Sequence, residues 1–391
     1  MSEQHPGLRG RPIYLDYNAT TPIDPRVFAA MTPYLTVEFD NPSSGHVFGR
    51  AAHRALDQAR SDVAALIGAA ASEMIFAGSG SEADALAIRG AVLAARAAGS
   101  DHPHMITQVT EHPAVLAACR DLQVLHGVAV TYLPVDATGR VDPGAVEAAI
   151  TPGTVLVSIM HANNETGTIQ PIAEIAAITR ARGVLLHTDA AQSIGKITVD
   201  VDDLGVDLLT VVGHKMYAPK GIAALYVRTG VLLHPIVAGG GQEHGLRAGT
   251  ENLAYAVGLG RAADLAGQAL SGGETARLAA LRDQLEQRLY DRLPGRVHLN
   301  GHPRERLPNT LNVRIPGAPA LALLAGMPTV AASAGSACHA GRDEPSGVLT
   351  AMGLTRQDAL SALRLSLGRW STTREIETAA AAIAVAALGP P

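Results

Sequence analysis

The sequence predicts an α/β protein built on a mostly parallel β-sheet covered by helices. Strand-like and helix-like segments alternate along most of the chain, as they do in βαβ units. Apolar runs such as Val155-Leu156-Val157 and Val184-Leu185-Leu186 lack polar alternation, which is typical of strands buried on both faces. A chain of 391 residues is long for a single core, so we expect two domains.

The expected elements follow from apolar periodicity and from Gly and Pro signals. Strands are expected over residues 13–16, 74–76, 104–109, 129–133, 154–160, 184–187, 208–212, 222–227, 311–315 and 363–367. Asp24-Pro25 starts the first helix, since Asp caps a helix and Pro suits its first position. Further helices are expected over residues 50–67, 82–98, 113–125, 143–150, 172–182 and 253–293.

Three signals organise the second part of the chain. Gly239-Gly240-Gly241 opens an irregular segment, Ser271-Gly272-Gly273 interrupts the long helix, and a capping box over 372–375 begins the last helix. We predict a large domain over residues 20–261 and a small domain formed by residues 1–19 and 262–391.

Composition and charge narrow the classes of function. The chain is 47% hydrophobic and 17% charged, as ordinary globular proteins are. A net charge of −5 argues against nucleic acid or an anionic membrane as partner. Residues 1–11 lack the apolar core of a secretory signal, and two cysteines make no disulfide framework, so we expect a cytoplasmic protein. We expect no metal.

The segment 208–215 reads as a buried strand that passes through Gly213 and ends on Lys215. The chain has three lysines against 28 arginines, so a lysine at a strand end stands out. A lysine amine can lose its proton and form a Schiff base with an aldehyde, which arginine cannot do. The alternative is a solvated surface lysine.

Asp189 follows another buried strand, 184–187. Ligands of parallel sheets bind outside the carboxyl ends of the strands, so Asp189 and Lys215 are expected to face one crevice. Pyridoxal 5'-phosphate (PLP) requires such a pair, a lysine for its aldehyde and an acid for its pyridine nitrogen. A helix N-cap is the alternative role for Asp189.

Two further strand-to-helix junctions carry candidate binding groups. The Gly/Ser loop 78–81 suits a phosphate, although it is neither a Walker loop nor a dinucleotide fingerprint and a plain tight turn is the alternative. His112 lies between a strand and a helix, where its ring could stack on a planar cofactor and move protons. A structural histidine is the alternative.

The two cysteines differ in their surroundings. Cys338 lies in the segment 334–347, which has almost no large apolar residue, so we expect a mobile, exposed loop and a reactive thiol beside His339. Cys119 falls on the apolar face of a helix and is expected in the core. Arg369 follows a small-domain strand and could clamp a carboxylate, with a surface arginine as the alternative.

These signals occur together with further short motifs in a fixed order. The segments are 14–22, 41–44, 110–112, 163–167, 187–192, 213–215, 219–221, 247–252, 335–338 and 364–369. In this order they resemble the cysteine desulfurases and selenocysteine lyases, which are fold-type I (class V aminotransferase-like) PLP enzymes. The resemblance covers essentially the whole chain and implies a seven-stranded sheet in the large domain, a smaller α+β domain and a homodimer.

The resemblance also implies a role for each matching residue. Lys215 would be the Schiff-base lysine, Asp189 the pyridinium partner, and Gln192 the donor to the phenolic oxygen of the ring. His112 would stack on the ring and Asn164 would position cofactor or substrate. The remaining roles are phosphate binding by Gly80, Ser81, His214 and the other subunit's Thr250, carboxylate binding by Arg369, and nucleophilic attack by Cys338.

The implied reaction converts L-cysteine to L-alanine and leaves a persulfide on Cys338 for an acceptor protein. Val212, which replaces a serine frequent in desulfurases, and the pair Cys338-His339 are more similar to selenocysteine lyases, so L-selenocysteine stays an alternative substrate. Pro113 does not distinguish the two. Another PLP reaction, such as a C–S lyase, is also open, whereas the intact set of residues argues against a non-enzymatic scaffold. Iron–sulfur assembly, tRNA thiolation, DNA phosphorothioation and natural-product sulfur insertion all remain open as destinations of the sulfur.

Overall fold

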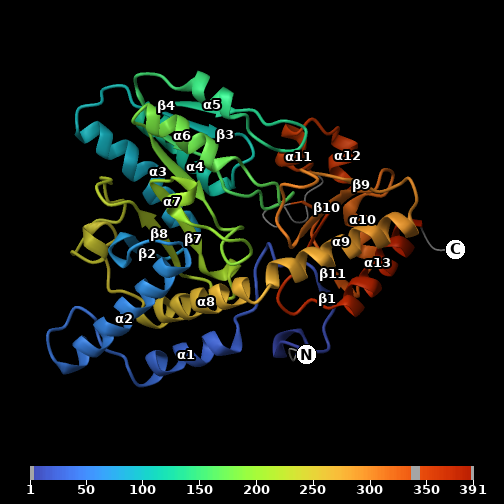
Figure 1. Cartoon of the computed structure of the whole chain (residues 1–391), viewed down its shortest axis with the longest axis horizontal. Helices are drawn as coiled ribbons and strands as arrows, with labels where there is room; N and C mark the ends of the chain where they lie inside the picture. Colours follow the sequence, from blue (N-terminus) through green and yellow to red (C-terminus); the bar gives the residue numbers. More distant parts are fainter. Residues whose placement is uncertain (1–3, 336–343, 389–391) are drawn as a thin grey trace.

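The structure is a computed structural model and describes residues 4–335 and 344–388. Its central sheet has seven strands in the order β2-β8-β7-β6-β5-β3-β4 (Figure 1). The strands are β2 (Met74–Ala77), β3 (His104–Gln108), β4 (Ala129–Leu133), β5 (Thr154–Ser158), β6 (Leu185–Asp189), β7 (Leu208–Val212) and β8 (Ala223–Val227). β8 runs antiparallel to both neighbours and the other pairings are parallel. The predicted mostly parallel, seven-stranded sheet is confirmed.

Helices cover both faces of this sheet. They are α1 (Pro25–Thr36), α2 (Val47–Leu66), α3 (Gly80–Ala97), α4 (Pro113–His126), α5 (Pro143–Ala149), α6 (Ile172–Ala181), α7 (Val201–Leu204) and α8 (Leu253–Ser271). Successive strand residues point to opposite faces, so Leu208 packs with the core beneath α3 and α4, and Leu209 packs with the core beneath α2, α6 and α8. This two-sided burial explains why the strand sequences lack polar alternation.

A second core lies beside the large sheet, at the right in Figure 1. Its strands are β1 (Ile13–Tyr14), β9 (His298–Leu299), β10 (Thr310–Arg314), β11 (Val330–Ala331) and β12 (Ala362–Ser366), and its helices are α9 (Glu274–Arg292), α10 (Ala320–Gly326), α11 (Gly347–Ala351), α12 (Arg356–Leu360) and α13 (Thr373–Leu388). β12, β10 and β9 form an antiparallel sheet, and β1 pairs with β11. The N-terminal segment therefore joins the C-terminal part of the chain.

The long helix predicted over 253–293 is two helices, with the break at Gly272 and Gly273. Gly273 has a φ of +83°, which residues with a Cβ rarely adopt. α8 packs against α1 and α2, whereas the buried leucines of α9 belong to the second core. We propose that the domains separate at this break, because a division at residue 261 would cut α8.

The capping signals in the sequence are also found in the structure. The Asp24 carboxylate accepts from the Arg26 backbone N–H at 2.9 Å and caps α1. The Thr372 backbone N–H donates to Glu375 at 2.9 Å while the Thr372 hydroxyl accepts from the Glu375 N–H, which confirms the capping box. The short elements β9, β11, α10, α11 and α12 were not predicted, because segments of two to seven residues carry too few periodic positions.

Across the two described stretches of the chain, no helix is both long enough and apolar enough to pass through a membrane.

Candidate active site

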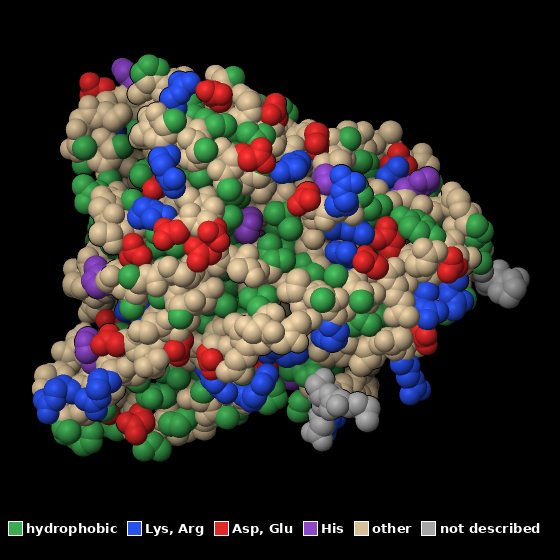
Figure 2. Space-filling view, in the orientation of Figure 1, with side chains coloured by type: hydrophobic (Ala, Val, Ile, Leu, Met, Phe, Trp, Pro, Cys, Tyr) green, Lys and Arg blue, Asp and Glu red, His purple; other side chains and the backbone are tan. Residues whose placement is uncertain are grey.

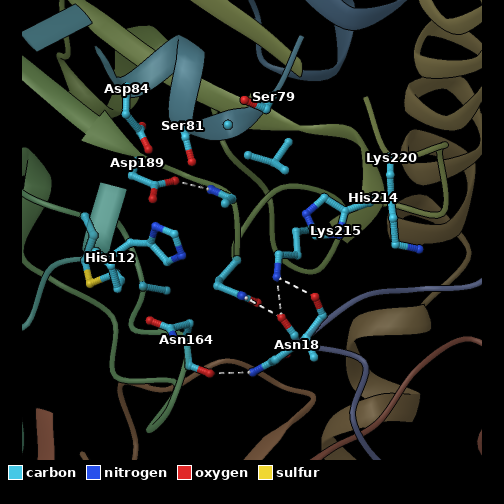
Figure 3. Close-up of a pocket in the computed structure, with 18 of the residues that line it drawn as sticks. Asn18, Ser79, Ser81, Asp84, His112, Asn164, Asp189, His214, Lys215 and Lys220 are labelled. Carbon is cyan, nitrogen blue, oxygen red and sulfur yellow. Dashed lines mark hydrogen bonds between the residues drawn. The ribbon is translucent and has the colours of Figure 1, made fainter. Parts of the chain in front are cut away.

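A cavity of about 400 Å³ opens at one edge of the large sheet, where it meets the second core (Figure 3). The chain segments that follow β2, β3, β5, β6 and β7 all reach this edge, because these strands run in the same direction. The predicted site residues that line the cavity are Gly80, Ser81, His112, Asn164, Asp189, Gln192, His214 and Lys215. The expectation that Asp189 and Lys215 face one crevice from their strand ends is met, and the other six residues lie around the same cavity.

Lys215 lies on a single 3-10 turn, Gly213–Lys215, directly after β7. Its Nζ donates to the backbone oxygens of Asn18 at 2.6 Å and Ala19 at 2.8 Å. The turn requires glycine at position 213, because a Cβ there would lie 2.9 Å from Ile222 atoms. The N-terminal segment after β1 therefore holds the amine at the cavity wall.

Asp189 is the last residue of β6, and its carboxylate accepts from the Ala191 N–H at 2.9 Å. Burial raises the pKa of Asp189, while His112 and Lys215 lower it. Asp84, one turn into α3, also lines the cavity, and Figure 3 shows its carboxyl group directed toward Asp189. Burial and the nearby Asp189 raise the pKa of Asp84 well above its usual value, so the two acids carry fewer than two negative charges.

The N-terminus of α3 faces the opposite end of the cavity from Asn164 (Figure 3). Ser79 caps the helix through its hydroxyl, which accepts from the Glu82 N–H, and the backbone at Gly80 and Ser81 begins the helix. A Cβ at Gly80 would lie 2.6 Å from a Val212 methyl carbon, so glycine allows the helix to approach β7. Backbone N–H groups at such a helix start favour an anion.

His214 lines the same end of the cavity, and its Nδ1 lies 3.1 Å from the Thr20 hydroxyl. Burial, together with Lys215 and Lys220, lowers the pKa of His214 to about 4. The ring is therefore neutral at pH 7, so it could bind an anion as a hydrogen-bond donor but not as a cation.

His112 caps α4, since its Nδ1 accepts from the Ala114 N–H at 3.2 Å. An accepting Nδ1 carries no hydrogen, so the ring hydrogen is on Nε2. Burial and Lys215 lower the pKa of His112, whereas Asp189 raises it. The ring is thus a neutral group in the wall of the cavity.

Two arginines of the second core differ in position. Arg364 on β12 lines the cavity, and its guanidinium donates to Asn164 O at 3.1 Å and to Asp16 Oδ1 at 2.8 Å. Arg369, the arginine predicted to bind a carboxylate, does not line the cavity. It donates to the buried Asp24 at 2.7 Å and lies over the Tyr217 ring.

The structure does not bring two other predicted residues into this cavity. Thr250 is exposed in the segment before α8, on the wall of a separate pocket with Phe76 and Arg247. Cys338 lies outside the described residues. Cys119, predicted to be core, is fully buried on α4, and burial raises the pKa of its thiol to about 12.

Four polar residues line the cavity without having been predicted as site residues from the sequence, namely Asn18, Asp84, Lys220 and Arg364. Asp84 follows Gly80 by four positions, which places both on one face of a helix. Arg364 is a lone charge within the apolar strand 363–367, and a buried charge calls for a partner. These two signals were present in the sequence, whereas the position of Asn18 depends on the pairing of β1 with β11.

Known proteins resemble this chain over most of its length. The model of the aminotransferase class-V family matches residues 13–378. A protein named cysteine desulfurase IscS from Anaeromyxobacter dehalogenans (strain 2CP-C) is 46% identical over 371 residues, which cover 94% of this chain and 90% of the relative.

Two solved structures share the fold. A structure titled NifS-like protein superposes with a TM-score of 0.87 at 34% identity and covers 95% of this chain and 98% of its own. A structure titled SspA in complex with cysteine has a TM-score of 0.79 at 37% identity and covers 91% of this chain and 98% of its own. With these matches, the chain belongs to the class-V aminotransferase family and, within it, to the relatives named cysteine desulfurases.

Proposed function

We propose that this protein is a PLP-dependent cysteine desulfurase that converts L-cysteine to L-alanine and leaves the sulfur as a persulfide on Cys338. The observation that carries the proposal is the placement of Lys215, Asp189 and the start of α3 around one cavity. Each of the three has a matching group on the cofactor, and the relatives named cysteine desulfurases share 43–47% of their residues with this chain.

The residues present fit PLP. The backbone N–H groups at Gly80 and Ser81, with the neutral His214, suit its phosphate. Burial raises the pKa of Asp189, and a protonated ring nitrogen beside it would lower that pKa and stabilise the carboxylate that holds the proton on the ring. Lys215 supplies the amine for covalent attachment. When bound, PLP would supply an electron-withdrawing ring that acidifies the substrate Cα–H.

Arg364 is the best candidate for the substrate carboxylate. A guanidinium has five N–H donors, and that of Arg364 donates to Asn164 and to Asp16. Its Nε is buried with no hydrogen-bond partner among the described residues. We therefore move the role predicted for Arg369 to Arg364, five positions earlier in the chain.

Lys215 and His112 are the groups placed to handle protons. The amine of Lys215 lies at the cavity wall, where it would accept the Cα proton of a bound substrate, and the backbone oxygens of Asn18 and Ala19 would stabilise it when protonated. His112 keeps its hydrogen on Nε2 while it caps α4, so it acts there as a donor toward the cavity.

Cys338 would supply the nucleophile. Its thiolate sulfur attacks the substrate sulfur, the substrate C–S bond breaks with its electron pair moving to the carbon side, and protonation at that carbon yields alanine. The described residues on either side of the segment meet at Glu165, which accepts from the Ser346 hydroxyl at 2.6 Å and lies 3.6 Å from an ideal Cβ on Gly335. Glu165 adjoins Asn164 of the cavity, and this proximity supports the assignment.

A homodimer would complete the site. Thr250 is exposed in its own chain and is the residue expected to reach the phosphate of the partner's cofactor. Large apolar side chains are exposed on α1, on α2 and between them, at the lower edge of Figure 2 where green side chains gather. They are Phe28, Leu35, Val37, Phe39, Val47 and Phe48. An exposed apolar surface of this kind indicates a protein–protein interface.

Subunit complementation tests the shared site. Mixing Lys215→Ala chains with Thr250→Val chains should restore activity, because a mixed dimer contains one site with both residues intact. Activity that stays at the level of the unmixed variants would show that Thr250 serves its own chain.

The activity itself is tested by alanine formation from L-cysteine and L-selenocysteine, measured side by side. We expect alanine from cysteine, together with one persulfide per active site in the absence of reductant. Val212 is apolar where it faces Gly80, and it is the observation that keeps selenocysteine as a second candidate substrate. Turnover of selenocysteine alone would make the protein a selenocysteine lyase. The absence of a visible band that borohydride bleaches would refute PLP binding.

The proposed thiol chemistry suits the reducing cytoplasm, and the sulfur acceptor is expected to be a protein.

A further inference from the structure

We infer that Lys196 is a positioning residue, which together with the Asn18 carbonyl oxygen holds the Gln192 carboxamide in the direction that presents an N–H donor to the active-site cavity. This inference rests on the proposed function, because the donor is directed to the ring oxygen of PLP. Lys196 itself does not line the cavity.

Lys196 is buried in the turn that follows β6, with 8% of its surface exposed. Its Nζ donates to Gln192 Oε1 at 2.8 Å and lies 3.4 Å from Asn18 Oδ1. Its backbone is held as well, since Thr275 at the start of α9 donates to the Lys196 carbonyl at 2.9 Å. Residues of both domains, Gln192 on one side and Asn18 and Thr275 on the other, therefore hold Lys196 in place behind the cavity wall.

The chemistry of the contact sets the orientation of the amide. A lysine amine donates hydrogen bonds whether it is charged or, through its N–H groups, neutral, and an amide oxygen only accepts them. Gln192 Oε1 must therefore face Lys196. Gln192 Nε2 then faces the other way and donates to Asn18 O at 3.0 Å, the same oxygen that accepts from Lys215.

The Asn18 carbonyl oxygen requires the same orientation, because it accepts from Gln192 Nε2 and a flipped amide would place two acceptors against each other. Lys196 holds the opposite end of the amide, through Gln192 Oε1. Without Lys196, contacts with the described residues would hold the amide only on the Nε2 side, and Oε1 would lose its donor inside the protein. Lys196 is thus the second of two contacts that keep the amide in the orientation that presents a donor to a cofactor oxygen.

The surroundings of Lys196 are unusual for a structural ion pair. Burial lowers its pKa well below the usual value, and Lys215 and Arg364 lower it further. A buried amine placed among amide oxygens and cations contributes little to stability, since burial of an ammonium group is costly. A methionine of similar length at this position should be tolerated, so the lysine is retained for its hydrogen bond.

Lys196→Met is the test, with three readouts on the wild-type dimer and the variant. PLP affinity of the apoprotein should fall roughly 10- to 100-fold, the effect of losing a hydrogen bond to a charged oxygen. The pH midpoint of the visible band of the bound cofactor should rise, because a donor to the ring oxygen favours its deprotonated form. Thermal unfolding without PLP should be unchanged or occur at higher temperature.

Two further variants separate positioning from charge and from packing. Lys196→Gln keeps an N–H donor without a charge and should restore much of the band position, which a purely electrostatic role would not allow. In a Gln192→Leu background, Lys196→Met should produce no additional change in PLP affinity or band position, because the effect passes through Gln192.

The outcomes are distinct. Additive effects in the double variant, or a wild-type affinity and pH midpoint in Lys196→Met, would overturn the inference. If Lys196→Met does not fold, the comparison of Lys196→Gln with Gln192→Leu decides between the same alternatives. Absence of PLP binding by the wild-type protein would instead refute the proposed function.

Discussion

The ε-amine of Lys215 donates to the carbonyl oxygen of Asn18 across 2.6 Å, although the two residues are 197 positions apart in the chain. Asn18 also accepts from Lys196 and Asn309 through its side-chain oxygen and donates to Thr310, so it joins β10 of the small domain to the cavity. The position of the amine therefore depends on both domains.

Lys215→Ala should abolish covalent attachment of PLP, because no other lysine among the described residues donates to the backbone oxygens of Asn18 and Ala19. The visible band bleached by borohydride should be absent. Lys220→Ala is the matched control, since Lys220 also lines the cavity and should leave covalent attachment intact. A normal band in Lys215→Ala would show that another amine holds the cofactor.

Arg364→Lys should raise the KM for cysteine roughly 10- to 100-fold, because a lysine cannot present two parallel N–H donors to a carboxylate. Arg369→Lys should leave KM nearly unchanged and should instead lower thermal stability, since Arg369 pairs with the buried Asp24. Steady-state kinetics and thermal unfolding of both variants provide the measurement. The reverse pattern would restore the role to Arg369.

Cys338→Ala should retain the bound cofactor and lose persulfide formation, because it removes the proposed nucleophile. Cys119→Ala is the control, since Cys119 is buried and its pKa is raised to about 12, which disfavours the thiolate. Alkylation of the persulfide followed by mass spectrometry locates the sulfur. Undiminished turnover in Cys338→Ala would rule out the assignment.

Asp24→Asn should remove one acid-sensitive contribution to the free energy of unfolding. Burial alone would raise the pKa of Asp24, but hydrogen bonds from Arg26 and Arg369 lower it from 3.8 to about 2. A carboxyl group whose pKa is lower in the folded than in the unfolded protein stabilises the fold when the pH is above the unfolded pKa. This contribution is lost as the pH falls from about 4 to 2. Asparagine keeps the cap of α1. The free energy of unfolding of the wild type should therefore exceed that of the variant by about 2 kcal/mol at pH 7, and the two values should converge near pH 2. Urea unfolding at several pH values measures the difference, and a constant gap would contradict the prediction.

Glu111→Gln should stabilise the protein at alkaline pH. Burial raises the pKa of Glu111 from 4.5 to about 8, while the Met160 N–H donates to it at 2.6 Å. A raised pKa in an acid destabilises the fold progressively as the pH rises from 4.5 to 8, by about 1.4 kcal/mol per pH unit. Glutamine keeps the acceptor for Met160, so the advantage of the variant should grow over this range and then level off. An advantage that does not vary with pH would show that Glu111 stays charged in the folded protein.

Much of the fold could be predicted because its signals are local. The apolar strands, the Asp24 cap and the box at Thr372 depend on residues within a few positions of one another, and each was found where expected. The two-residue strand β11 was missed because it carries too few periodic positions and its pairing partner β1 lies more than 300 residues away in the chain. Arg364 and Arg369 illustrate the same limit, since both belong to the segment 364–369 and only tertiary contacts place one at the cavity and the other against Asp24.

The sequence by itself determined the alternation of strands and helices and the strand-end placement of Lys215 and Asp189, because each property follows from neighbouring residues and the polarity of a parallel sheet. Only the tertiary structure decided that Arg364 rather than Arg369 reaches the cavity, that Asp84 lies beside Asp189, and that Lys196 holds Gln192. These relationships depend on contacts between distant segments, whose geometry is fixed when two cores pack together and not by any local pattern.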